Sequence, residues 1–509
     1  MKSKENKINI KKKENKNKLI KFGTDGWRGI IAKEFTYDKV LFISQGISNY
    51  LKSLKNLKSS IPKVVIGYDT RFLSDIFAEG AAKVFSKNGI ITEISQTFIP
   101  TPILSNAVVS RNADLGIMIT ASHNPYVYNG YKIKGPYGGS ATMDIISDIE
   151  SYVNSISYDE FLSKDFKSIN EDNDEKNEGI KNKNKNSYYI KSNFITDYLK
   201  KINELINTKL LNNINFKILI DSMYGAAQGI YSSILKSFNL NNVIEIHNIF
   251  NPAFGGINPE PVGKNILEAT EFLKQNKIKI GICLDGDADR IGAIGEEGNF
   301  ISSHHIFAIV LRDLIRNGKK ASEVIKTVTT SSIIDRIVNK NNLSLKIKPV
   351  GFKYIAEEIV KGNVLMGGEE SGGLWTNGNI PERDGMLMGL KLLEIVAREN
   401  KSLNMILNEI YDEYGYFVYE RNDYEMEIKE RDKIKSLLEL QIPPAIEKQK
   451  VKEVITIDGF KYVFDDDSWL MIRPSGTEAV VRVYAESSDE KRLKELLDIG
   501  KEICKGGKL

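Results

Sequence analysis

The chain has 509 residues, which at about 100–200 residues per domain predicts three to five domains and excludes a peptide or a single small module. Its 71 basic and 67 acidic side chains give a net charge of +4, but residues 1–20 hold eight lysines and two glutamates. Residues 21–509 therefore carry 63 basic against 65 acidic side chains, a net charge of −2. Nucleic-acid binding needs a clustered basic surplus, so no nucleic-acid partner is expected.

The cysteines and the first residues bear on the compartment. Cys283 and Cys504 are too few for a disulfide framework, which favours a reducing environment. Residues 1–20 contain no apolar run typical of a signal peptide, and no later stretch approaches the 18 apolar residues of a membrane span. A cytoplasmic protein without membrane contact is predicted. Its Lys/Asn-rich tail, 1–20, is interpreted as disordered, and Glu5 and Glu14 weaken the alternative of a targeting segment.

Short apolar runs alternate with amphipathic helical segments, such as 74–87, in three successive passes. The runs of the three passes lie at 64–69, 91–95 and 115–125; at 216–225, 243–248 and 280–290; and at 324–331, 345–351 and 363–373. Each pass closes with an apolar strand that leads into a polar loop. Because ligands of open α/β sheets bind beyond the carboxyl ends of the strands, three such loops are expected to share one site.

This pattern predicts three repeated mixed α/β domains and a smaller C-terminal α+β domain around a central cleft. The C-terminal part has the order strand, loop, strand and helix, with the helix at 489–504. The predicted divisions are the tail at 1–20, domain I at 21–169, a low-complexity insertion at 170–187, domain II at 188–297, domain III at 298–407 and domain IV at 408–509.

Ser122 and His123 follow the last apolar strand of the first pass, in the sequence Ala-Ser-His-Asn-Pro. A serine held at the end of a rigid strand suits a phosphoryl acceptor, whereas an ordinary Ser/Asn/Pro turn is the alternative. No G-x-S-x-G sequence surrounds Ser122, which argues against an acyl-transfer triad. A phosphoryl acceptor fits best if a metal site lies nearby.

Asp285, Asp287 and Asp289 alternate in the loop after the last strand of the second pass. Carboxylates without Cys or His favour Mg²⁺ or a similar hard cation. An EF-hand is the first alternative, but Arg290 stands where its loop needs glycine. A solvated acidic turn is the second alternative, and the apolar strand before the loop argues against it.

Two further loops carry polar side chains among glycines. Glu369 and Ser371, in Gly-Glu-Glu-Ser-Gly-Gly, offer acceptors and a donor for sugar hydroxyls, with a surface turn as the alternative. A phosphate nest is predicted in Arg-Pro-Ser-Gly-Thr-Glu and just after it, with a plain hairpin turn as the alternative. Its residues are Arg473, Ser475, Gly476, Thr477 and Arg482. Neither a Walker lysine motif nor a G-x-G-x-x-G fingerprint accompanies them, which disfavours nucleotide binding.

These four loops, in this order, and the opening Phe-Gly-Thr-Asp-Gly-Trp-Arg-Gly that contains Arg28 resemble the α-D-phosphohexomutase superfamily over residues 21–509. Its members are phosphoglucomutases, phosphomannomutases and phosphoglucosamine mutases. The resemblance implies that Ser122 is phosphorylated and that its phosphate and the three aspartates hold Mg²⁺. It also implies phosphoryl transfer between the 1- and 6-positions of a hexose phosphate, with glucose 1,6-bisphosphate as intermediate and activator. Hexose phosphates are then the partners, and the chain is expected to be a monomer or homodimer.

The resemblance also assigns roles to single residues. Lys132, in Asn-Gly-Tyr-Lys, matches a candidate general acid or base, and His123, beside the serine, is a second candidate. Arg28, Arg290 and Lys353 are expected to bind substrate, together with Glu369, Ser371 and the predicted phosphate nest.

The chain departs from the family's pattern at a few positions. Ala479 replaces a common proline, and because the predicted phosphate-binding residues are intact, a looser turn with retained binding is expected. Gly373 stands where bacterial phosphoglucosamine mutases and many phosphomannomutases have histidine, and Trp27 stands where phosphoglucosamine mutases commonly have isoleucine. The sequence thus favours a phosphoglucomutase/phosphomannomutase. A phosphoglucosamine mutase is the first alternative, and a non-catalytic sugar-phosphate-binding regulator is the alternative of another class.

Overall fold

The computed structural model describes residues 20–23, 26–170, 189–318, 321–440, 445–446, 449–476 and 478–506. The Lys/Asn-rich tail up to residue 19, residues 171–188 of the low-complexity region and Thr477 lie outside the described residues. Within the described part of the chain, no helix is long and apolar enough to cross a membrane.

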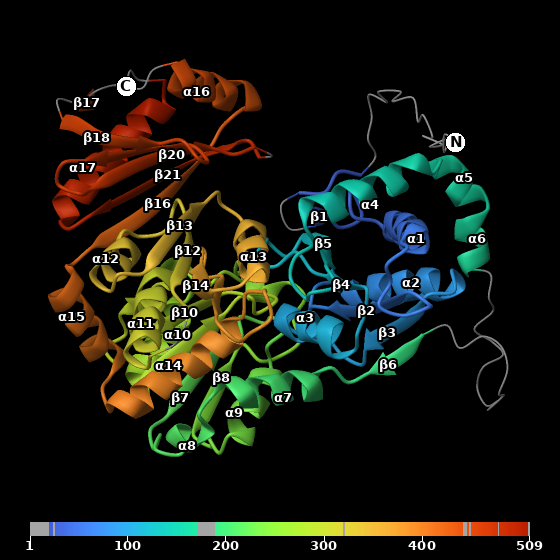
Figure 1. Cartoon of the computed structure of the whole chain (residues 1–509), viewed down its shortest axis with the longest axis horizontal. Coiled ribbons are helices and arrows are strands. Elements are labelled where there is room, and N and C mark those ends of the chain that lie inside the picture. Colours follow the sequence, from blue (N-terminus) through green and yellow to red (C-terminus); the bar gives the residue numbers. More distant parts are fainter. Residues whose placement is uncertain are drawn as a thin grey trace, which may run out of the picture.

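The first sheet is mixed and has the strand order β1-β5-β4-β2-β3-β6 (Figure 1). Its strands are β1 Trp27–Ile30, β2 Lys63–Tyr68, β3 Ile91–Ser95, β4 Leu115–Ile119, β5 Tyr128–Lys134 and β6 Ile190–Ser192. All five residues of β4 are buried, as expected for a strand covered on both faces. The accompanying helices are α1 Tyr37–Ser53, α2 Ser74–Lys87, α3 Thr101–Ser110, α4 Met143–Ser155, α5 Tyr158–Ser163 and α6 Asp165–Asn170. Gly80 of α2 lets α1 approach, because a Cβ atom there would lie 2.6 Å from the Tyr37 ring.

The second sheet has the order β11-β10-β9-β7-β8, with β7, β8 and β9 parallel. Its strands are β7 Ile218–Asp221, β8 Val243–Ile246, β9 Ile280–Leu284, β10 Ile291–Ile294 and β11 Phe300–Ile301. The helices of this region are α7 Ile195–Leu205, α8 Thr208–Leu211, α9 Ile230–Ser237 and α10 Leu267–Gln275.

The third sheet has the order β13-β12-β14-β15. Its strands are β12 Glu323–Thr327, β13 Ser344–Lys348, β14 Val364–Gly368 and β15 Leu374–Thr376. The helices are α11 Ser303–Arg316, α12 Ile333–Lys340, α13 Phe352–Lys361, α14 Gly385–Glu399 and α15 Leu403–Tyr414. Asp384 fixes the start of α14, because its side chain accepts a hydrogen bond from the Leu387 backbone.

The fourth sheet is antiparallel, with the order β16-β21-β20-β19-β18-β17. Its strands are β16 Val418–Glu425, β17 Ala445–Ile446, β18 Gln449–Ile455, β19 Phe460–Phe464, β20 Trp469–Pro474 and β21 Val480–Ser487, and its helices are α16 Ile428–Leu440 and α17 Glu490–Cys504. Three mixed α/β units and an antiparallel C-terminal sheet confirm the predicted fold class.

The largest apolar core joins three of these units rather than filling one of them. It contains Ile103 of α3, Ile282 of β9 and Leu365 of β14. The C-terminal sheet has a separate core that includes Leu470 and Leu496. Because α3 and the second and third sheets share one core, the loops at their edges are held in fixed positions relative to one another.

Candidate active site

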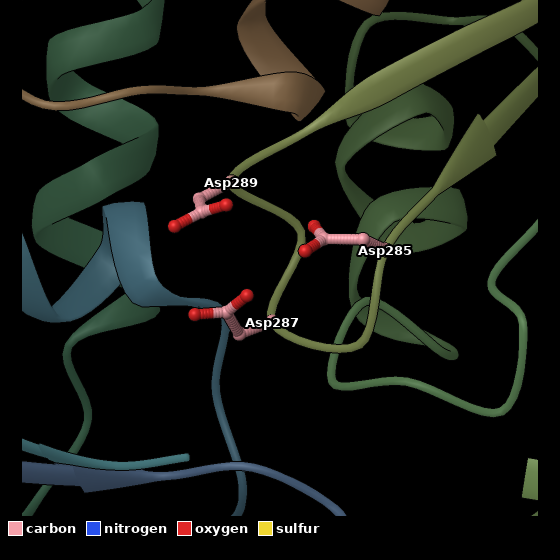
Figure 2. A group of neighbouring side chains, drawn as sticks. All are labelled: Asp285, Asp287 and Asp289. Carbon is pink, nitrogen blue, oxygen red and sulfur yellow. The ribbon is translucent and has the colours of Figure 1, made fainter. Parts of the chain in front are cut away.

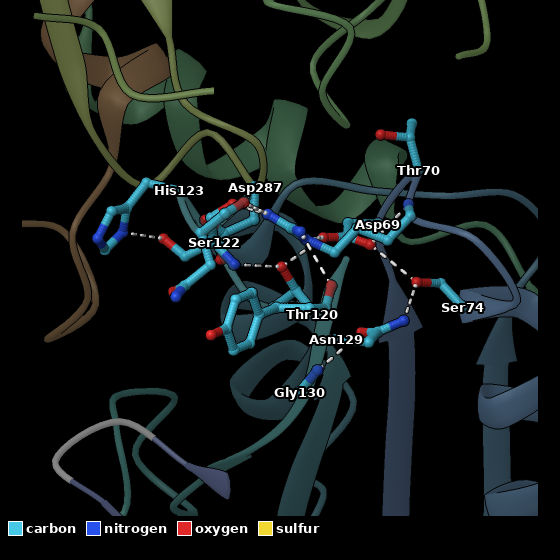
Figure 3. A network of polar contacts seen from close by, with 12 residues as sticks. Asp69, Thr70, Ser74, Thr120, Ser122, His123, Asn129, Gly130 and Asp287 are labelled. Carbon is cyan, nitrogen blue, oxygen red and sulfur yellow. Dashed lines mark hydrogen bonds and ion pairs between the residues drawn. The ribbon is translucent and has the colours of Figure 1, made fainter. Parts of the chain in front are cut away.

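Ser122 lies in the turn after β4 and is completely buried. Its φ of +54° is uncommon for a residue other than glycine. The hydroxyl donates a hydrogen bond to Asp285 Oδ2 at 2.9 Å. The backbone N–H donates to Thr120 Oγ1 at 2.9 Å (Figure 3). A side chain of the first sheet's loop thus touches the loop of the second sheet, 163 residues away in the sequence.

The three aspartates lie in the loop between β9 and β10, and all three are completely buried. Their ligand oxygens lie within 4.8 Å of one another, and Figure 2 shows the three carboxylates projecting from a single loop. Asp287 Oδ1 and Asp289 Oδ1 are buried and have no hydrogen-bond partner among the described residues. Clustered, partly unsatisfied carboxylate oxygens are the donor set that suits Mg²⁺.

Cations beside this loop offset part of its charge. Lys132 Nζ of β5 lies 2.9 Å from Asp287 Oδ2 and 3.3 Å from Asp289 Oδ2. Burial favours the neutral acid, yet Lys132 and a hydrogen bond from Thr101 hold the pKa of Asp287 below its ordinary value. Burial, reinforced by the other two aspartates, instead raises the pKa of Asp285 well above its ordinary value. The loop therefore places carboxylates of different basicity within one small space.

His123 follows Ser122, and its Nδ1 lies 3.5 Å from the serine oxygen. Burial lowers the pKa of His123 well below its ordinary value, and Arg290 and Arg28 lower it further. The imidazole is therefore neutral at pH 7. Arg28 itself donates to Asn124 Oδ1 at 2.7 Å, and Arg290 Nε lies 3.9 Å from Asp289 Oδ1, so both arginines border the serine and aspartate loops.

Glu369 lies directly after β14 and is buried, whereas Ser371 is half-buried. Glu369 Oε1 accepts a hydrogen bond from the Gly351 backbone at 3.1 Å, and Oε2 lies 3.5 Å from Arg383 Nη1. Burial raises the pKa of Glu369 to about 7, although Arg383 opposes the shift. Arg383 Nη2 also lies 2.7 Å from Asp289 Oδ2, so one arginine joins the Glu369 loop to the aspartate loop.

Lys353, predicted to bind substrate, lies in the first turn of α13 and is buried. Its ammonium lies 3.0 Å from Met143 Sδ of α4 and 4.9 Å from the centre of the Tyr354 ring. The side chain therefore lies where the first and third units meet.

The predicted phosphate nest lies in the turn between β20 and β21, on the C-terminal sheet. Arg473 and Arg482 are directly opposite each other in the two strands. Arg473 Nε lies 3.1 Å from Asp458 Oδ1, and Arg482 Nη2 lies 2.5 Å from Glu478 Oε2. Ser475 is buried before the turn, Gly476 lies within it, and Thr477 is outside the described residues.

The structure thus brings Ser122, His123, Lys132 and the three aspartates together, with Arg28 and Arg290 at their border. The phosphate nest lies on the C-terminal sheet, which contacts the Glu369 loop through an ion pair. Arg421 Nη1 of β16, near Arg482, lies 3.3 Å from Glu370 Oε1 in the Glu369 loop.

Sequence reasoning missed several charged residues of this region, namely Asp69, Arg71, Glu382, Arg383 and Arg421. Asp69 and Arg71 belong to Tyr-Asp-Thr-Arg at the end of β2, where a polar group after an apolar strand is the same signal that identified the other loops. Arg383 and Arg421 carry no comparable local signal, because the partners that join them to the other loops, Asp289 and Glu370, are far away in the sequence.

Family models of the phosphoglucomutase/phosphomannomutase domains match nearly the whole chain. Alpha/beta/alpha domains I, II and III match residues 19–160, 196–298 and 302–414, and the C-terminal domain matches residues 425–499. A phosphoglucomutase/phosphomannomutase of Thermococcus kodakarensis is 29% identical over 94% of this chain and 97% of its own length. A phosphoglucosamine mutase of Methanocaldococcus jannaschii is 31% identical over 87% of this chain and 92% of its own. The crystal structure of a protein described as a phosphomannomutase from Thermus thermophilus has a TM-score of 0.80 and 29% identity, over 96% of this chain and 99% of that one.

Proposed function

The chain belongs to the phosphoglucomutase/phosphomannomutase family, within the α-D-phosphohexomutase superfamily, and on this premise we propose that it interconverts glucose 1-phosphate and glucose 6-phosphate and also accepts mannose phosphates. Members of the family are phosphohexomutases, enzymes of the isomerase class. The observation that carries the proposal is the 2.9 Å contact of the Ser122 hydroxyl with Asp285. It supports the proposal because the serine proposed as phosphoryl acceptor touches a cluster of carboxylates suited to Mg²⁺.

Ser122 is proposed to carry the phosphoryl group. Phosphoserine 122 gives its phosphoryl group to the free hydroxyl of the hexose phosphate, which forms the 1,6-bisphosphate and leaves the serine hydroxyl. The bisphosphate reorients and returns its other phosphoryl group to Ser122. Because both steps move phosphoryl between oxygens, positioning and charge stabilisation supply most of the catalysis.

The Ser122 phosphate, Asp285, Asp287 and Asp289 are proposed to hold Mg²⁺. The buried Oδ1 atoms of Asp287 and Asp289, which accept no hydrogen bond from the described residues, fit such a ligand set. Bound Mg²⁺ would neutralise charge on the transferring phosphoryl group.

Proton transfer is assigned to Lys132 or His123. Lys132, which pairs with Asp287 and Asp289, is proposed to donate a proton to the serine oxygen as the phosphoryl group leaves. Neutral His123, 3.5 Å from Ser122 Oγ, can accept one. Lys132 is buried and His123 is half-buried, and each lies beside a residue of the proposed site.

Substrate contacts are assigned to the loops around this centre. Glu369 and Ser371 would hold the sugar hydroxyls, and Arg28, Arg290 and Lys353 would bind the substrate near the phosphoserine. The phosphate that is not transferred would be held by residues of the C-terminal sheet, namely Arg473, Ser475, Gly476, Thr477 and Arg482. Such a nest must accept either end of the bisphosphate, which a separate domain can do by moving.

The test is the isomerisation of glucose 1-phosphate by the purified chain with Mg²⁺ and glucose 1,6-bisphosphate. Glucose 6-phosphate should form, and Ser122→Ala should abolish both the activity and the phosphoprotein mass. Ser48→Ala is the matched control, because Ser48 is a buried serine of α1 that donates only to the Ser44 backbone. If the wild-type chain isomerises no glucose, mannose or glucosamine phosphate, the proposal is wrong.

Phosphoglucosamine mutase is the second candidate, because relatives with that activity in their names are as similar as the phosphoglucomutase/phosphomannomutase. Comparing kcat/KM for glucose, mannose and glucosamine 1-phosphates decides between them. A ratio that favours glucosamine 1-phosphate by tenfold or more, about 1.4 kcal/mol of transition-state discrimination, would select the second candidate.

A further inference from the structure

Arg71, between β2 and α2, is only 2% exposed although it carries a permanent charge. We propose that Arg71 is a positioning residue that holds the Ser122 loop in the shape needed for phosphoryl transfer. This inference rests on the proposed function of Ser122. It adds a residue whose side chain donates to the Asp69 carboxylate and to backbone carbonyls of the serine loop.

The guanidinium uses all five of its N–H donors. Nη2 donates to the carbonyl oxygens of Ser122 and Asn124, both at 2.6 Å, and Nη1 donates to those of Pro125 and Tyr128 at 2.9 and 3.0 Å. Nε donates to Asp69 Oδ2 at 3.1 Å. Four carbonyls of one short loop therefore turn inward onto one cation. Without it the carbonyl of the completely buried Ser122 would lose this donor, and an unpaired buried group costs about 1–3 kcal/mol. The Pro125 carbonyl would keep a second donor, the Tyr128 N–H at 3.0 Å.

Asp69 extends the same network to the other side of Ser122. Its Oδ2 accepts a hydrogen bond from Thr120 Oγ1 at 2.5 Å, and Thr120 Oγ1 accepts one from the Ser122 N–H at 2.9 Å (Figure 3). The backbone of Ser122 is thus held at its N–H through Asp69 and at its carbonyl by Arg71. This double hold opposes relaxation of the left-handed φ of +54°, a conformation that costs about 1 kcal/mol or more outside glycine.

The fixed backbone determines where the serine hydroxyl points. With both neighbouring peptide groups held, Ser122 Oγ lies 2.9 Å from Asp285 Oδ2. The second unit also contributes, because the Phe254 ring covers the guanidinium at 4.8 Å and Thr70 Oγ1 donates to the Tyr224 carbonyl at 2.8 Å. Arg71 therefore lies where the serine loop and the aspartate-bearing unit are joined.

Lysine cannot reproduce this arrangement, because its ammonium has three donors and no planar fork. Arg71→Lys keeps the charge but leaves carbonyls of the loop unpaired. A displacement of about 1 Å between reacting groups is enough to slow a reaction about 100-fold. We therefore expect Arg71→Lys to lower kcat by about 10- to 100-fold and to change KM for glucose 1-phosphate by less than about threefold. Arg71→Met should lower kcat further.

The matched controls are Arg312→Lys and Arg312→Met. Arg312 is 1% exposed and pairs with Glu399 and Glu409 at 2.7 and 3.1 Å, remote from the serine loop. For each variant, the melting temperature, kcat, KM and the rate of Ser122 phosphorylation by glucose 1,6-bisphosphate are measured, the last by intact mass. The proposal is supported if Ser122 is phosphorylated slowly in folded Arg71 variants and if both Arg312 variants are phosphorylated at the wild-type rate per folded molecule.

A kcat of Arg71→Lys within threefold of wild type would overturn the inference. A loss of activity that is fully explained by a smaller fraction of folded protein would also overturn it. Thr120→Val provides a milder variant that keeps Arg71 and changes one hydroxyl. It should slow Ser122 phosphorylation about 3- to 10-fold, and an unchanged rate would also count against the network. If wild type itself isomerises no hexose phosphate, the proposed function fails instead, and the two failures are thereby distinguished.

Discussion

Arg421 Nη1 of β16 lies 3.3 Å from Glu370 Oε1 and so joins the C-terminal sheet to the loop that carries Glu369. The same guanidinium forks onto Asp423, with distances of 2.8 and 2.9 Å. Asp423 Oδ2 in turn lies 3.5 Å from Arg482 Nε. A continuous chain of charges thus connects the predicted sugar loop to the predicted phosphate nest.

Breaking the Arg421–Glu370 pair should weaken substrate binding more than turnover. We expect Arg421→Met and Glu370→Gln each to raise KM for glucose 1-phosphate about 3- to 10-fold, with kcat within about twofold. The double variant should show a coupling energy of about 1 kcal/mol, because the pair is partly buried. Steady-state kinetics of the double-mutant cycle measures this energy. The exposed pair Lys452–Asp467 is the control, and additive effects for Arg421 and Glu370 would contradict the predicted connection.

Removing the metal should abolish activity, and metal affinity should depend on pH. The pKa of Asp285 is raised by burial and by its two neighbours, whereas Mg²⁺ binds the ionised carboxylate. Where Asp285 is protonated, Mg²⁺ binding must therefore release a proton, and the dissociation constant should fall as pH rises through the raised pKa of Asp285. Calorimetry in buffers of different ionisation enthalpy measures the released proton.

Asp285→Asn should weaken Mg²⁺ binding at least about tenfold. Asp313→Asn changes a carboxylate paired with Arg398 elsewhere in the chain and should leave Mg²⁺ affinity unaltered. An affinity that is independent of pH, with no proton released, would show that Asp285 is not among the ligands.

Lys132 should have opposite effects on catalysis and on metal binding. As a general acid it contributes about 10²- to 10⁴-fold to rate, so Lys132→Met should lower kcat by that order. The same substitution removes a cation 2.9 Å from Asp287, which should leave Mg²⁺ affinity equal or higher. Measuring kcat and Mg²⁺ affinity on one preparation tests both. If kcat falls only because Mg²⁺ no longer binds, the acid–base role is wrong.

The elements that sequence reasoning places well are those whose pattern is local. Helix α2 is predicted at 74–87 and runs Ser74–Lys87, and β3 and β9 begin at the expected residues. Continuous apolar runs identify buried strands, and the polar residues directly after them identify loops. For this reason Ser122 and the three aspartates could be found without coordinates.

The remaining site residues have partners that no local pattern records, even at Arg71, where the polar group after β2 is itself a local signal. Arg71 and Ser122 are 51 residues apart, and Arg383 contacts Asp289 from another sheet. Sequence alone does not distinguish a buried arginine from an exposed one. Periodicity predicts which face of an element is apolar, but it does not predict which distant loop will surround a cation. Which residues become partners depends on how the sheets pack against one another.

The pH dependence of sugar binding should reveal Glu369. Burial raises its pKa to about 7, and only the ionised carboxylate accepts hydrogen bonds from two sugar hydroxyls. Affinity for glucose 6-phosphate should therefore increase as pH rises from 6 to 8. The phosphate of the substrate also ionises near pH 6, but it does so equally with Glu369→Gln, whose affinity should rise less steeply. Calorimetric titration of both proteins isolates the contribution of Glu369.

The contribution of Glu369 to stability should fall with rising pH, whereas its contribution to sugar binding should increase. The folded chain holds the Glu369 proton more tightly than the unfolded chain, in which the pKa is near 4.5. The contribution of Glu369 to the free energy of unfolding is therefore full below pH 4.5 and is lost as pH rises to about 7. Glu369→Gln should melt higher than wild type at pH 8 and gain less at pH 5. If the difference in melting temperature between the two proteins is the same at every pH, the pKa of Glu369 is not raised by folding and this prediction is wrong.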